Sequence, residues 1–344
     1  MNIKKSKCAA LFRLVPVLAL ASWMGVSAAE PAKPALKPEP AREAAPLYQP
    51  VLLDALKLDW EKAVELRPGV RVFRLASEGA WQTRQLHEGP RLMKIVLMRV
   101  ALQGLQFTGT GRDKDWGQKM PDHPTGIIRT LRVRTADFMK HARAPKDQGG
   151  RGLDMIVASN TAPWSPWQPP YTHKYGDPSG IEISDGTIVC DNRNHYRAIF
   201  VVWKSGKLEI TDDIPRERFP DVWLAHTGFG LLIRDGKDTP CSGYDRAINP
   251  RMAAGYSKDQ KYLFLLTIDG RQPGWSDGAY GSDMQKLFRA AGASDAISFD
   301  GGGSATLCYW DDKTQQPVML NRHTKSGYAR PCGMNWGLYR KDAN

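Results

Sequence analysis

A strand–helix–strand pattern towards the C-terminus restricts the fold of this 344-residue chain more than any other feature. Residues 262–268 form an uninterrupted apolar run typical of a buried strand, and residues 296–299 form another. Between them, one apolar stripe at helical spacing predicts a helix: Met284, Leu287, Phe288 and Ala291. A capping box and a stop glycine mark its ends: Ser282, Gln285 and Gly292. This order predicts a βαβ unit over residues 262–299 with parallel strands.

Both predicted strands end in an aspartate followed by glycine. Asp269 precedes Gly270, and Asp300 precedes three consecutive glycines, Gly301, Gly302 and Gly303, and then Ser304. The carboxyl ends of parallel strands share one rim of a sheet, where ligands bind in folds of this kind, so we expect the two aspartates near each other. A triple glycine removes side chains from the backbone and leaves amide N–H groups available to an anion. The alternative interpretation of the three glycines is a tight turn that leads into another strand at 305–310.

The rest of the chain predicts short strands and few helices. Alternating or continuous apolar runs predict strands at 70–75, 94–102 and 153–158. Hairpins are expected where Asp-Gly or Ser-Gly separates two apolar runs, at 185–186, 205–206 and 235–236. Residues 135–143 read as a short helix with Thr135 as its N-cap. We therefore expect an α+β fold with mixed, strand-rich sheets and a few packed helices, forming a single domain over residues 51–344.

The N-terminus has the composition of an export signal. Four basic residues precede an apolar run at 14–26, and small residues follow it, so residues 1–29 are predicted to be a signal peptide. A Pro/Ala-rich linker is expected over residues 30–50. Without the signal the net charge falls from +12 to a dispersed +8, which does not favour nucleic-acid binding. The sequence thus predicts a secreted or periplasmic protein with no stable membrane insertion after signal cleavage.

Four cysteines follow the predicted signal peptide: Cys190, Cys241, Cys308 and Cys332. Their spacing excludes a Cys-x-x-Cys motif. An even number in an exported chain favours two disulfides, and we expect Cys190 to pair with Cys241 and Cys308 with Cys332. Four cysteines allow three connectivities, so the pairing itself stays open.

The blocks 250–255, 267–276 and 297–306 together resemble the phosphodiester glycosidase family. They read Pro-Arg-Met-Ala-Ala-Gly, Thr-Ile-Asp-Gly-Arg-Gln-Pro-Gly-Trp-Ser and Ile-Ser-Phe-Asp-Gly-Gly-Gly-Ser-Ala-Thr. The resemblance extends more weakly over residues 90–340. It implies a hydrolase that cleaves the bond between a sugar C1 and a phosphodiester oxygen in envelope or extracellular glycans, with a carbohydrate or sugar-phosphate substrate. No cofactor is expected, and the seven histidines, none within a local His-x-x-x-His pair, imply no metal.

The resemblance also implies a set of site residues. Asp269 and Asp300 are the catalytic carboxylate candidates, as nucleophile, base or sugar anchor, and which takes which role stays open. Arginines bind phosphate oxygens in a bidentate way, so three are candidates for a phosphate clamp: Arg251, Arg271 and Arg330. Further substrate-binding candidates are Asn160, Ser304, the three glycines at 301–303, Trp164 and His226. Trp167 and Trp275 could stack on a sugar, although ordinary packing explains tryptophans equally well.

One block departs from the family pattern. Asn160 is followed by Thr161, Ala162, Pro163 and Trp164, where the family usually has Gly-Gly or Ala-Gly after the asparagine and then an aromatic residue. The proline changes this loop, so substrate preference is expected to differ within the family.

Three other functions have partial support in the sequence. A serine hydrolase built on Ser304 and His226 is excluded because Thr306 breaks the Gly-x-Ser-x-Gly elbow. A metal-dependent phosphodiesterase with Asp269 and Asp300 as ligands remains an alternative, which loss of activity with a chelator would indicate. A non-catalytic polysaccharide-binding protein is the other alternative.

Overall fold

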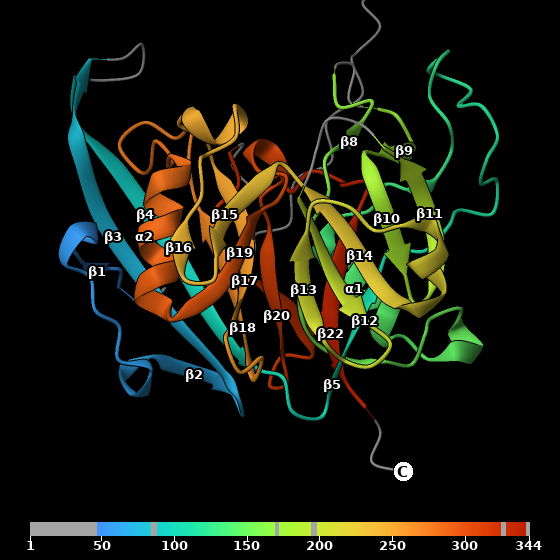
Figure 1. Cartoon of the computed structure of the whole chain (residues 1–344), viewed down its shortest axis with the longest axis horizontal. Helices are drawn as coiled ribbons and strands as arrows, with labels where there is room; N and C mark the ends of the chain where they lie inside the picture. Colours follow the sequence, from blue (N-terminus) through green and yellow to red (C-terminus); the bar gives the residue numbers. More distant parts are fainter. Residues whose placement is uncertain (1–46, 84–87, 169–171, 194–197, 325–327, 342–344) are drawn as a thin grey trace, which may run out of the picture. The chain divides into compact units, whose positions relative to one another are not determined.

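The computed structural model describes residues 47–83, 88–168, 172–193, 198–324 and 328–341. The predicted signal peptide, and the predicted linker up to residue 46, lie outside the described residues. Strands in four sheets dominate the described part of the chain (Figure 1). This arrangement confirms the predicted α+β class with strand-rich, mixed sheets.

The largest sheet contains nine strands. Eight follow the order β1-β3-β4-β18-β17-β19-β15-β16, and β2 pairs with β3 outside this path. Their bounds are β1 Gln49–Pro50, β2 Val64–Arg67, β3 Val70–Thr83, β4 Glu88–Ala101, β15 Gly230–Arg234, β16 Lys237–Asp238, β17 Arg251–Ser257, β18 Tyr262–Ile268 and β19 Ala293–Ser298. β1 runs parallel to β3, whereas the other described pairings in this sheet are antiparallel.

The predicted βαβ unit is confirmed in a split form. β18 and β19 run in the same direction, and helix α2 (Gly281–Ala291) connects them. β17 lies between the two strands and is antiparallel to both. The two strands therefore end at the same rim of the sheet, as expected, but one strand apart.

The other strands of the described residues form two five-stranded sheets and one small sheet. One has the order β11-β10-β14-β12-β13, another β21-β20-β7-β22-β5, and the three-stranded sheet β6-β9-β8. The bounds are β5 Leu105–Gly109, β6 Thr130–Leu131, β7 Asp154–Asn160, β8 Trp164–Ser165, β9 Tyr175–Pro178, β10 Gly180–Ser184, β11 Thr187–Asn192, β12 Ala198–Trp203, β13 Leu208–Thr211, β14 Val222–Gly228, β20 Leu307–Asp311, β21 Gln316–Met319 and β22 Asn335–Arg340. The three predicted hairpins are confirmed as β10–β11, β12–β13 and β15–β16.

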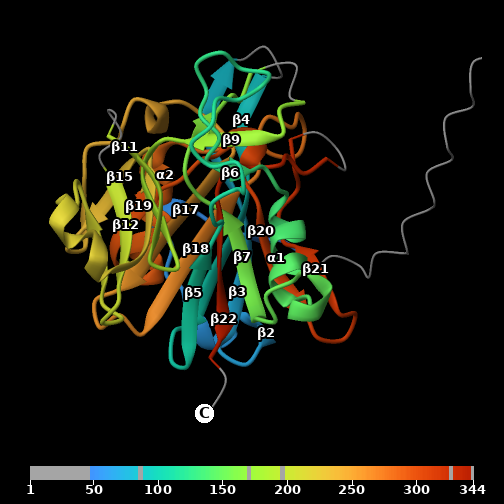
Figure 2. The same ribbon diagram turned by 90° about the vertical axis from the view of Figure 1, so that its right-hand side faces the viewer.

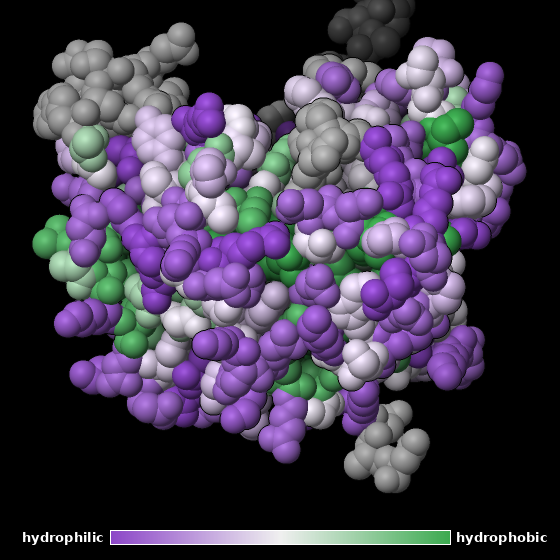
Figure 3. Space-filling view, viewed as in Figure 1, coloured by the Kyte–Doolittle hydropathy of each residue, from purple (hydrophilic) through white to green (hydrophobic). Residues whose placement is uncertain are grey.

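One apolar core joins the three large sheets. It collects buried side chains from all three, including Met98, Phe200, Phe299, Leu307 and Trp336. On its other face the nine-stranded sheet packs against α2, and the sheet containing β7 packs against α1 (Thr135–Arg143), as Figure 2 shows. Figure 3 shows mostly hydrophilic side chains on one face, with apolar groups in separate patches.

The helices form where the sequence predicts them, with different N-terminal caps. α1 spans the predicted residues, but Arg134 is its N-cap, and the Thr135 hydroxyl instead donates to Asn335 Oδ1 at 2.7 Å. α2 begins at Gly281, and the Asp283 carboxylate accepts a bond from the Tyr280 N–H at 2.8 Å, which replaces the predicted Ser282–Gln285 box. Six short 3-10 helices are also described: Leu53–Ala55, Trp60–Lys62, Lys146–Gln148, Arg216–Asp221, Tyr244–Arg246 and Gly302–Ser304. Among the described residues no helix is long and apolar enough to cross a membrane.

The predicted disulfides are wrong, because all four cysteines are free thiols. Cys190 lies in β11 and its Sγ donates to the Pro178 carbonyl at 3.2 Å. Cys308 lies in β20, among the side chains that pack against α1. Burial raises the pKa of the Cys190, Cys308 and Cys332 thiols to about 12, which keeps them protonated. An even count of cysteines carries no information on whether the fold brings any two together.

Candidate active site

The two predicted aspartates lie at one rim of the nine-stranded sheet. Asp269 directly follows β18, and Asp300 follows β19. β17 separates the two strands, so the backbones of the aspartates are about 10 Å apart, or two strand spacings. The start of β17 therefore lies between the two aspartates.

The glycine loop at 301–303 runs tightly against its neighbours. The Gly302 N–H donates to the Pro250 carbonyl at 2.9 Å, and Gly302 adopts a left-handed φ of 58°. A Cβ on Gly301 would collide with the Pro250 carbonyl oxygen, and one on Gly303 would come within 2.6 Å of Arg330 Nη2. The absence of side chains is thus a steric requirement of this loop.

Two of the predicted arginines flank the glycine loop. Arg330 lies against Gly303, and Arg271 Nη1 lies 3.3 Å from the position of a Cβ on Gly302. Arg271 is exposed, has a left-handed φ of 57°, and donates from Nη2 to Asn249 Oδ1 at 2.6 Å. A loop of small residues between two guanidinium groups forms a positively charged cradle.

Asp300 is the carboxyl group next to this cradle. Burial raises its pKa to about 6, against the lowering effects of the Ser304 hydroxyl, Arg330 and Arg271. Near neutral pH the group is therefore poised between its protonated and ionised forms, as acid–base catalysts are.

Asp269 is anchored through both carboxylate oxygens. The Trp275 indole N–H donates to Oδ2 at 2.7 Å, and the Arg322 backbone N–H donates to Oδ1 at 2.9 Å. Burial raises the pKa of Asp269 to about 6, and these donors together with the Arg322 and Arg74 charges oppose the rise. The residue is 3% exposed, so its orientation is fixed before any substrate arrives.

Asn160 and Ser304 lie next to the glycine loop at 301–303. The Asn160 amide donates to the Asp300 carbonyl at 2.6 Å and accepts from the Thr306 N–H at 3.0 Å, so it ties the two ends of the loop to β7. Ser304 is fully buried beside Asp300. Both residues lie at the predicted site, and these contacts give Asn160 a part in positioning the loop.

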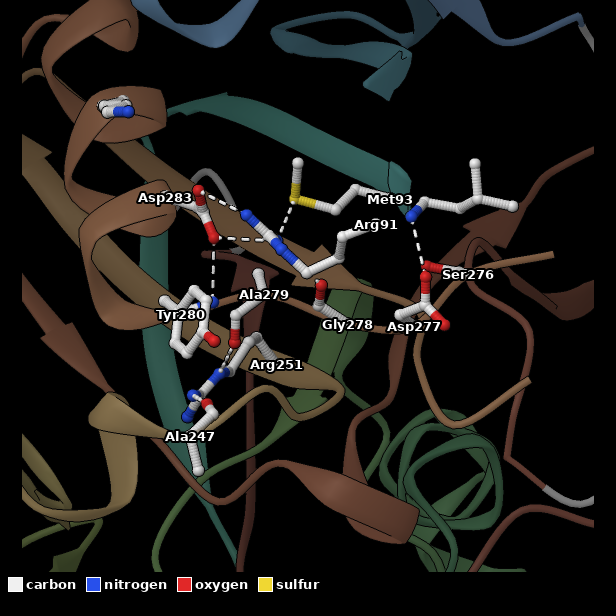
Figure 4. A network of polar contacts seen from close by, with 12 residues as sticks. Arg91, Met93, Ala247, Arg251, Ser276, Asp277, Gly278, Ala279, Tyr280 and Asp283 are labelled. Carbon is white, nitrogen blue, oxygen red and sulfur yellow. Dashed lines mark hydrogen bonds and ion pairs between the residues drawn. The ribbon is translucent and has the colours of Figure 1, made fainter. Parts of the chain in front are cut away.

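Arg251 lies at the rim, but its guanidinium group points into the protein. It donates from Nε to the Ala279 carbonyl at 2.7 Å, pairs with Asp245 at 3.0 Å, and also donates to the Ala247 carbonyl. Figure 4 shows this arginine beside a second buried ion pair, Arg91 with Asp283 at 2.9 Å. Together they hold the chain between Asp269 and α2.

Trp164 and His226 lie apart from the loop's contacts. Trp164 is 4% exposed, and the Arg132 guanidinium covers its ring at 4.3 Å, whereas Trp167 is 54% exposed. His226 is fully buried in β14, where its Nδ1 lies 2.7 Å from a Glu182 oxygen. The structure therefore does not bring His226 into contact with the aspartates.

Several neighbours of the aspartates were not predicted, among them His323 and Tyr48. His323 Nε2 lies 3.0 Å from the Thr306 hydroxyl, one residue after the Arg322 N–H that binds Asp269, and burial lowers the His323 pKa. Tyr48 packs edge-to-face on Trp275, with ring centroids 5.7 Å apart. No local motif marks these residues, because segments far apart in sequence bring them to the rim.

The arrangement suits an anionic group with an electrophilic centre beside it. Two guanidinium groups and a side-chain-free loop favour a phosphate, and two carboxyl groups with pKa near 6 can each hold or release a proton. Within the described residues, no group of three or more His, Cys, Asp or Glu side chains is placed to hold a metal ion.

Comparisons with a family profile and with solved structures bear on the family and the fold of this chain. The family profile described as phosphodiester glycosidase matches residues 167–339, half of the chain. The catalytic domain of zebrafish N-acetylglucosamine-1-phosphodiester alpha-N-acetylglucosaminidase, auto-inhibited by its pro-peptide, has a similar fold (TM-score 0.54). It is 17% identical over 81% of this chain and 87% of the zebrafish chain.

A hypothetical protein from Synechocystis also matches (TM-score 0.46, 13% identity, 81% of this chain and 64% of that chain). No curated protein matches in sequence. The profile match places both aspartates, the glycine loop and the two flanking arginines inside the matched residues. The chain belongs to the phosphodiester glycosidase family and is a hydrolase of that family.

Proposed function

We propose that this protein is an exported hydrolase that cleaves sugar-1-phosphodiesters in envelope or extracellular glycans. The observation that carries the proposal is the glycine loop held between Arg271 and Arg330, next to Asp300. The name of the zebrafish relative supports the reaction, since it describes an enzyme acting on an N-acetylglucosamine-1-phosphodiester.

The chemistry of this bond matches the arrangement of charges. A water oxygen bonds to the sugar C1 and the water gives one proton to a carboxylate, while the C1–O bond breaks and the phosphate monoester leaves with the bonding electron pair. Positive charge develops at C1 and negative charge on the phosphate, so an oriented carboxylate and a cationic clamp both stabilise the transition state. We assign Asp269 to the side of the sugar and Asp300, with the two arginines, to the side of the phosphate.

The predicted signal peptide supports a location outside the cytoplasm, where glycans with sugar-phosphate linkages occur. The partner of the protein is then a carbohydrate. The charge of the chain after the predicted signal is modest and dispersed, which does not favour nucleic acid as a partner.

A substrate panel tests the proposal. Methyl phosphodiesters of glucose, galactose, mannose and N-acetylglucosamine, in both anomeric forms, are incubated with the parent protein and with Asp269→Asn and Asp300→Asn. The corresponding methyl glycosides, which lack phosphate, are incubated in parallel, and Asp212→Asn at an exposed position is the matched control. We expect phosphodiesters alone to be cleaved, by the parent and the control.

Two results would contradict the proposal. One is no turnover of any phosphodiester by the parent protein. The other is equal turnover by the parent and both site variants. Repeating the assay with a chelator and then with added Mg²⁺ or Ca²⁺ separates this reaction from a metal-dependent phosphodiesterase.

A further inference from the structure

A cavity of about 390 Å³ opens beside Trp275, within the size range of binding pockets. Its walls are residues 50–52 at and after β1, residues 76–78 of β3, residues 92–94 of β4, and Gly274 with Trp275. Neither aspartate of the rim lines it, and neither does the glycine loop.

Backbone and side-chain hydrogen bonds fix the walls of this cavity. The Val51 N–H donates to the Ala76 carbonyl at 2.8 Å, which holds the chain after β1 against β3. The Lys94 N–H donates to Ser276 Oγ at 3.0 Å, so the loop that carries Trp275 is held against β4 (Figure 4 shows Ser276). The cavity is therefore preformed.

The order of strands places the cavity on one side of Asp269 and the phosphate cradle on the other. The cavity lies at β3 and β4, Asp269 follows β18, and the glycine loop follows β19, in the sheet order β3-β4-β18-β17-β19. Trp275 connects the cavity to Asp269, since it lines the cavity and its indole N–H donates to Asp269 at 2.7 Å. A group in the cavity would thus adjoin the sugar on the side away from the phosphate.

The lining of the cavity combines apolar surface with both donors and acceptors. Leu52 is 76% exposed at its edge, and Trp275 provides aromatic surface. Glu78 offers a carboxylate, and the Lys94 ammonium lies 5.4 Å from the Trp275 ring centroid. Ser77 is 5% exposed, and its hydroxyl has no hydrogen-bond partner among the described residues.

This mixture fits a neutral sugar better than an anion or an apolar chain. A sugar ring presents C–H groups to aromatic and aliphatic surface and hydroxyls to donors and acceptors. The opposite charges of Glu78 and Lys94 offset each other, so the lining has no excess of positive charge that would favour a second phosphate. An acyl chain would leave the polar groups at 77, 78 and 94 unpaired.

We propose that this cavity is a second sugar subsite, which binds the unit attached to the reacting sugar on the side away from the phosphate. The substrate class is then an oligosaccharide-1-phosphodiester or polymer. The identity of the reacting bond rests on the proposed function, whereas sugar binding by the cavity does not.

Two measurements test the subsite. The first compares kcat/KM for methyl phosphodiesters of glucose, maltose, cellobiose, N-acetylglucosamine and chitobiose. At least one disaccharide ester should exceed its monosaccharide by about tenfold, which corresponds to about 1.4 kcal/mol. Leu52→Ala with Glu78→Ala should bring this ratio close to one and leave the monosaccharide esters unchanged. The exposed pair Leu131→Ala with Glu217→Ala, outside the cavity, should keep the full ratio.

The second measurement needs no turnover. Saturation-transfer NMR detects binding of maltotriose, cellotriose and chitotriose to the parent protein and to the same variants. We expect one trisaccharide to bind the parent and the control and to lose most of its signal with the Leu52/Glu78 variant.

Equal kcat/KM for every mono- and disaccharide pair overturns the subsite, as does trisaccharide binding that is absent or unaffected by the Leu52/Glu78 change. If no ester is hydrolysed but a trisaccharide binds through Leu52 and Glu78, the proposed function fails and the subsite stands. Thermal melting of each variant confirms that it is folded.

Discussion

Among the described residues, two pairs of ionisable side chains whose pKa values burial has displaced lie in contrasting surroundings. One is the rim with Asp269 and Asp300, and the other is the Glu182–His226 pair between β10 and β14. Only the first lies beside cationic side chains and a loop without side chains. The comparison shows that a displaced pKa by itself does not identify a catalytic site.

The Glu182–His226 pair is sealed within the protein. Both side chains are fully buried, and Glu182 Oε2 lies 2.7 Å from His226 Nδ1 while Oε1 accepts from the Thr227 N–H at 2.9 Å. Burial raises the pKa of Glu182 well above its ordinary value and lowers that of His226 to about 3. Both groups are therefore neutral, and the pair contributes to packing between strands.

The rim with Asp269 and Asp300 differs from the Glu182–His226 pair in solvent access and in the charge of its surroundings. Asp300 is partly exposed, and the positive charges of Arg330 and Arg271 act on it. A substrate phosphate can therefore meet both a cationic clamp and a titratable carboxyl group there. If the contrast is correct, substitutions at the rim change catalysis, and substitutions at the sealed pair change stability.

The largest expected effect is on turnover. Asp300→Asn keeps the shape of the side chain and removes its proton chemistry, so we expect kcat to fall by about 10³-fold. Glu182→Gln makes the same chemical change at the sealed pair and should leave kcat within about twofold of the parent. Steady-state kinetics on the best phosphodiester of the panel measures both. A similar loss in the two variants would remove the distinction between the regions.

Arg271 should give the next largest effect. Its guanidinium lies against the glycine loop, and Arg271→Ala should lower kcat/KM by about 10²-fold by removing part of the phosphate clamp. Arg271→Lys keeps the charge but loses the planar fork, so it should recover only part of the loss. Full activity in the lysine variant would show that charge alone is needed. An unaffected alanine variant would take Arg271 out of the site.

The sequence locates the rim because its signals are local. Asp269 and Asp300 each follow an apolar run that reads as a strand, and the order of elements predicts that both strands end at one edge. Even so, it does not show that β17 separates them, since strand order depends on pairings between distant segments. The prediction of a shared rim is confirmed, while the catalytic roles stay predictions.

Side-chain direction and long-range contacts are what the sequence lacks. Arg251 lies in a family-like motif, yet a buried Asp245 holds its guanidinium inside the protein. His226 has no local feature that separates it from His323, and only the folded chain places His323 near the aspartates. The disulfide prediction failed for the same reason, because spacing along the chain does not determine which cysteines lie close together in space.

The pH dependence of activity should reflect the rim. Burial raises the pKa of both Asp269 and Asp300 to about 6. If one must be ionised and the other protonated, kcat/KM is greatest near pH 6. It falls above that pH as the acid loses its proton and below it as the base gains one. Between about pH 6 and pH 8 we expect a fall of about 25-fold. A constant rate between about pH 5 and pH 8 would exclude this division of roles.

The smallest expected effect is a pH-dependent change in stability at the sealed pair. Glu182 keeps its proton in the folded state, but the unfolded chain releases it above the ordinary pKa of glutamate. The contribution of Glu182 to the free energy of unfolding of the parent therefore falls as the pH rises, by up to about 1.4 kcal/mol for each pH unit. The amide that replaces this carboxyl group in Glu182→Gln has no proton to release in either state. The variant should therefore become more stable relative to the parent between about pH 5 and pH 7.

His226 contributes equally to the free energy of unfolding of the parent and of Glu182→Gln, so its contribution cancels in the difference between them. Urea denaturation at several pH values measures this difference. Glu182→Ala, which leaves the Thr227 N–H without its acceptor, should be about 2 kcal/mol less stable than Glu182→Gln at all of them. A difference between Glu182→Gln and the parent that does not change with pH would mean that Glu182 is ionised in the folded protein. The sealed pair would then be a buried charge rather than a neutral packing element.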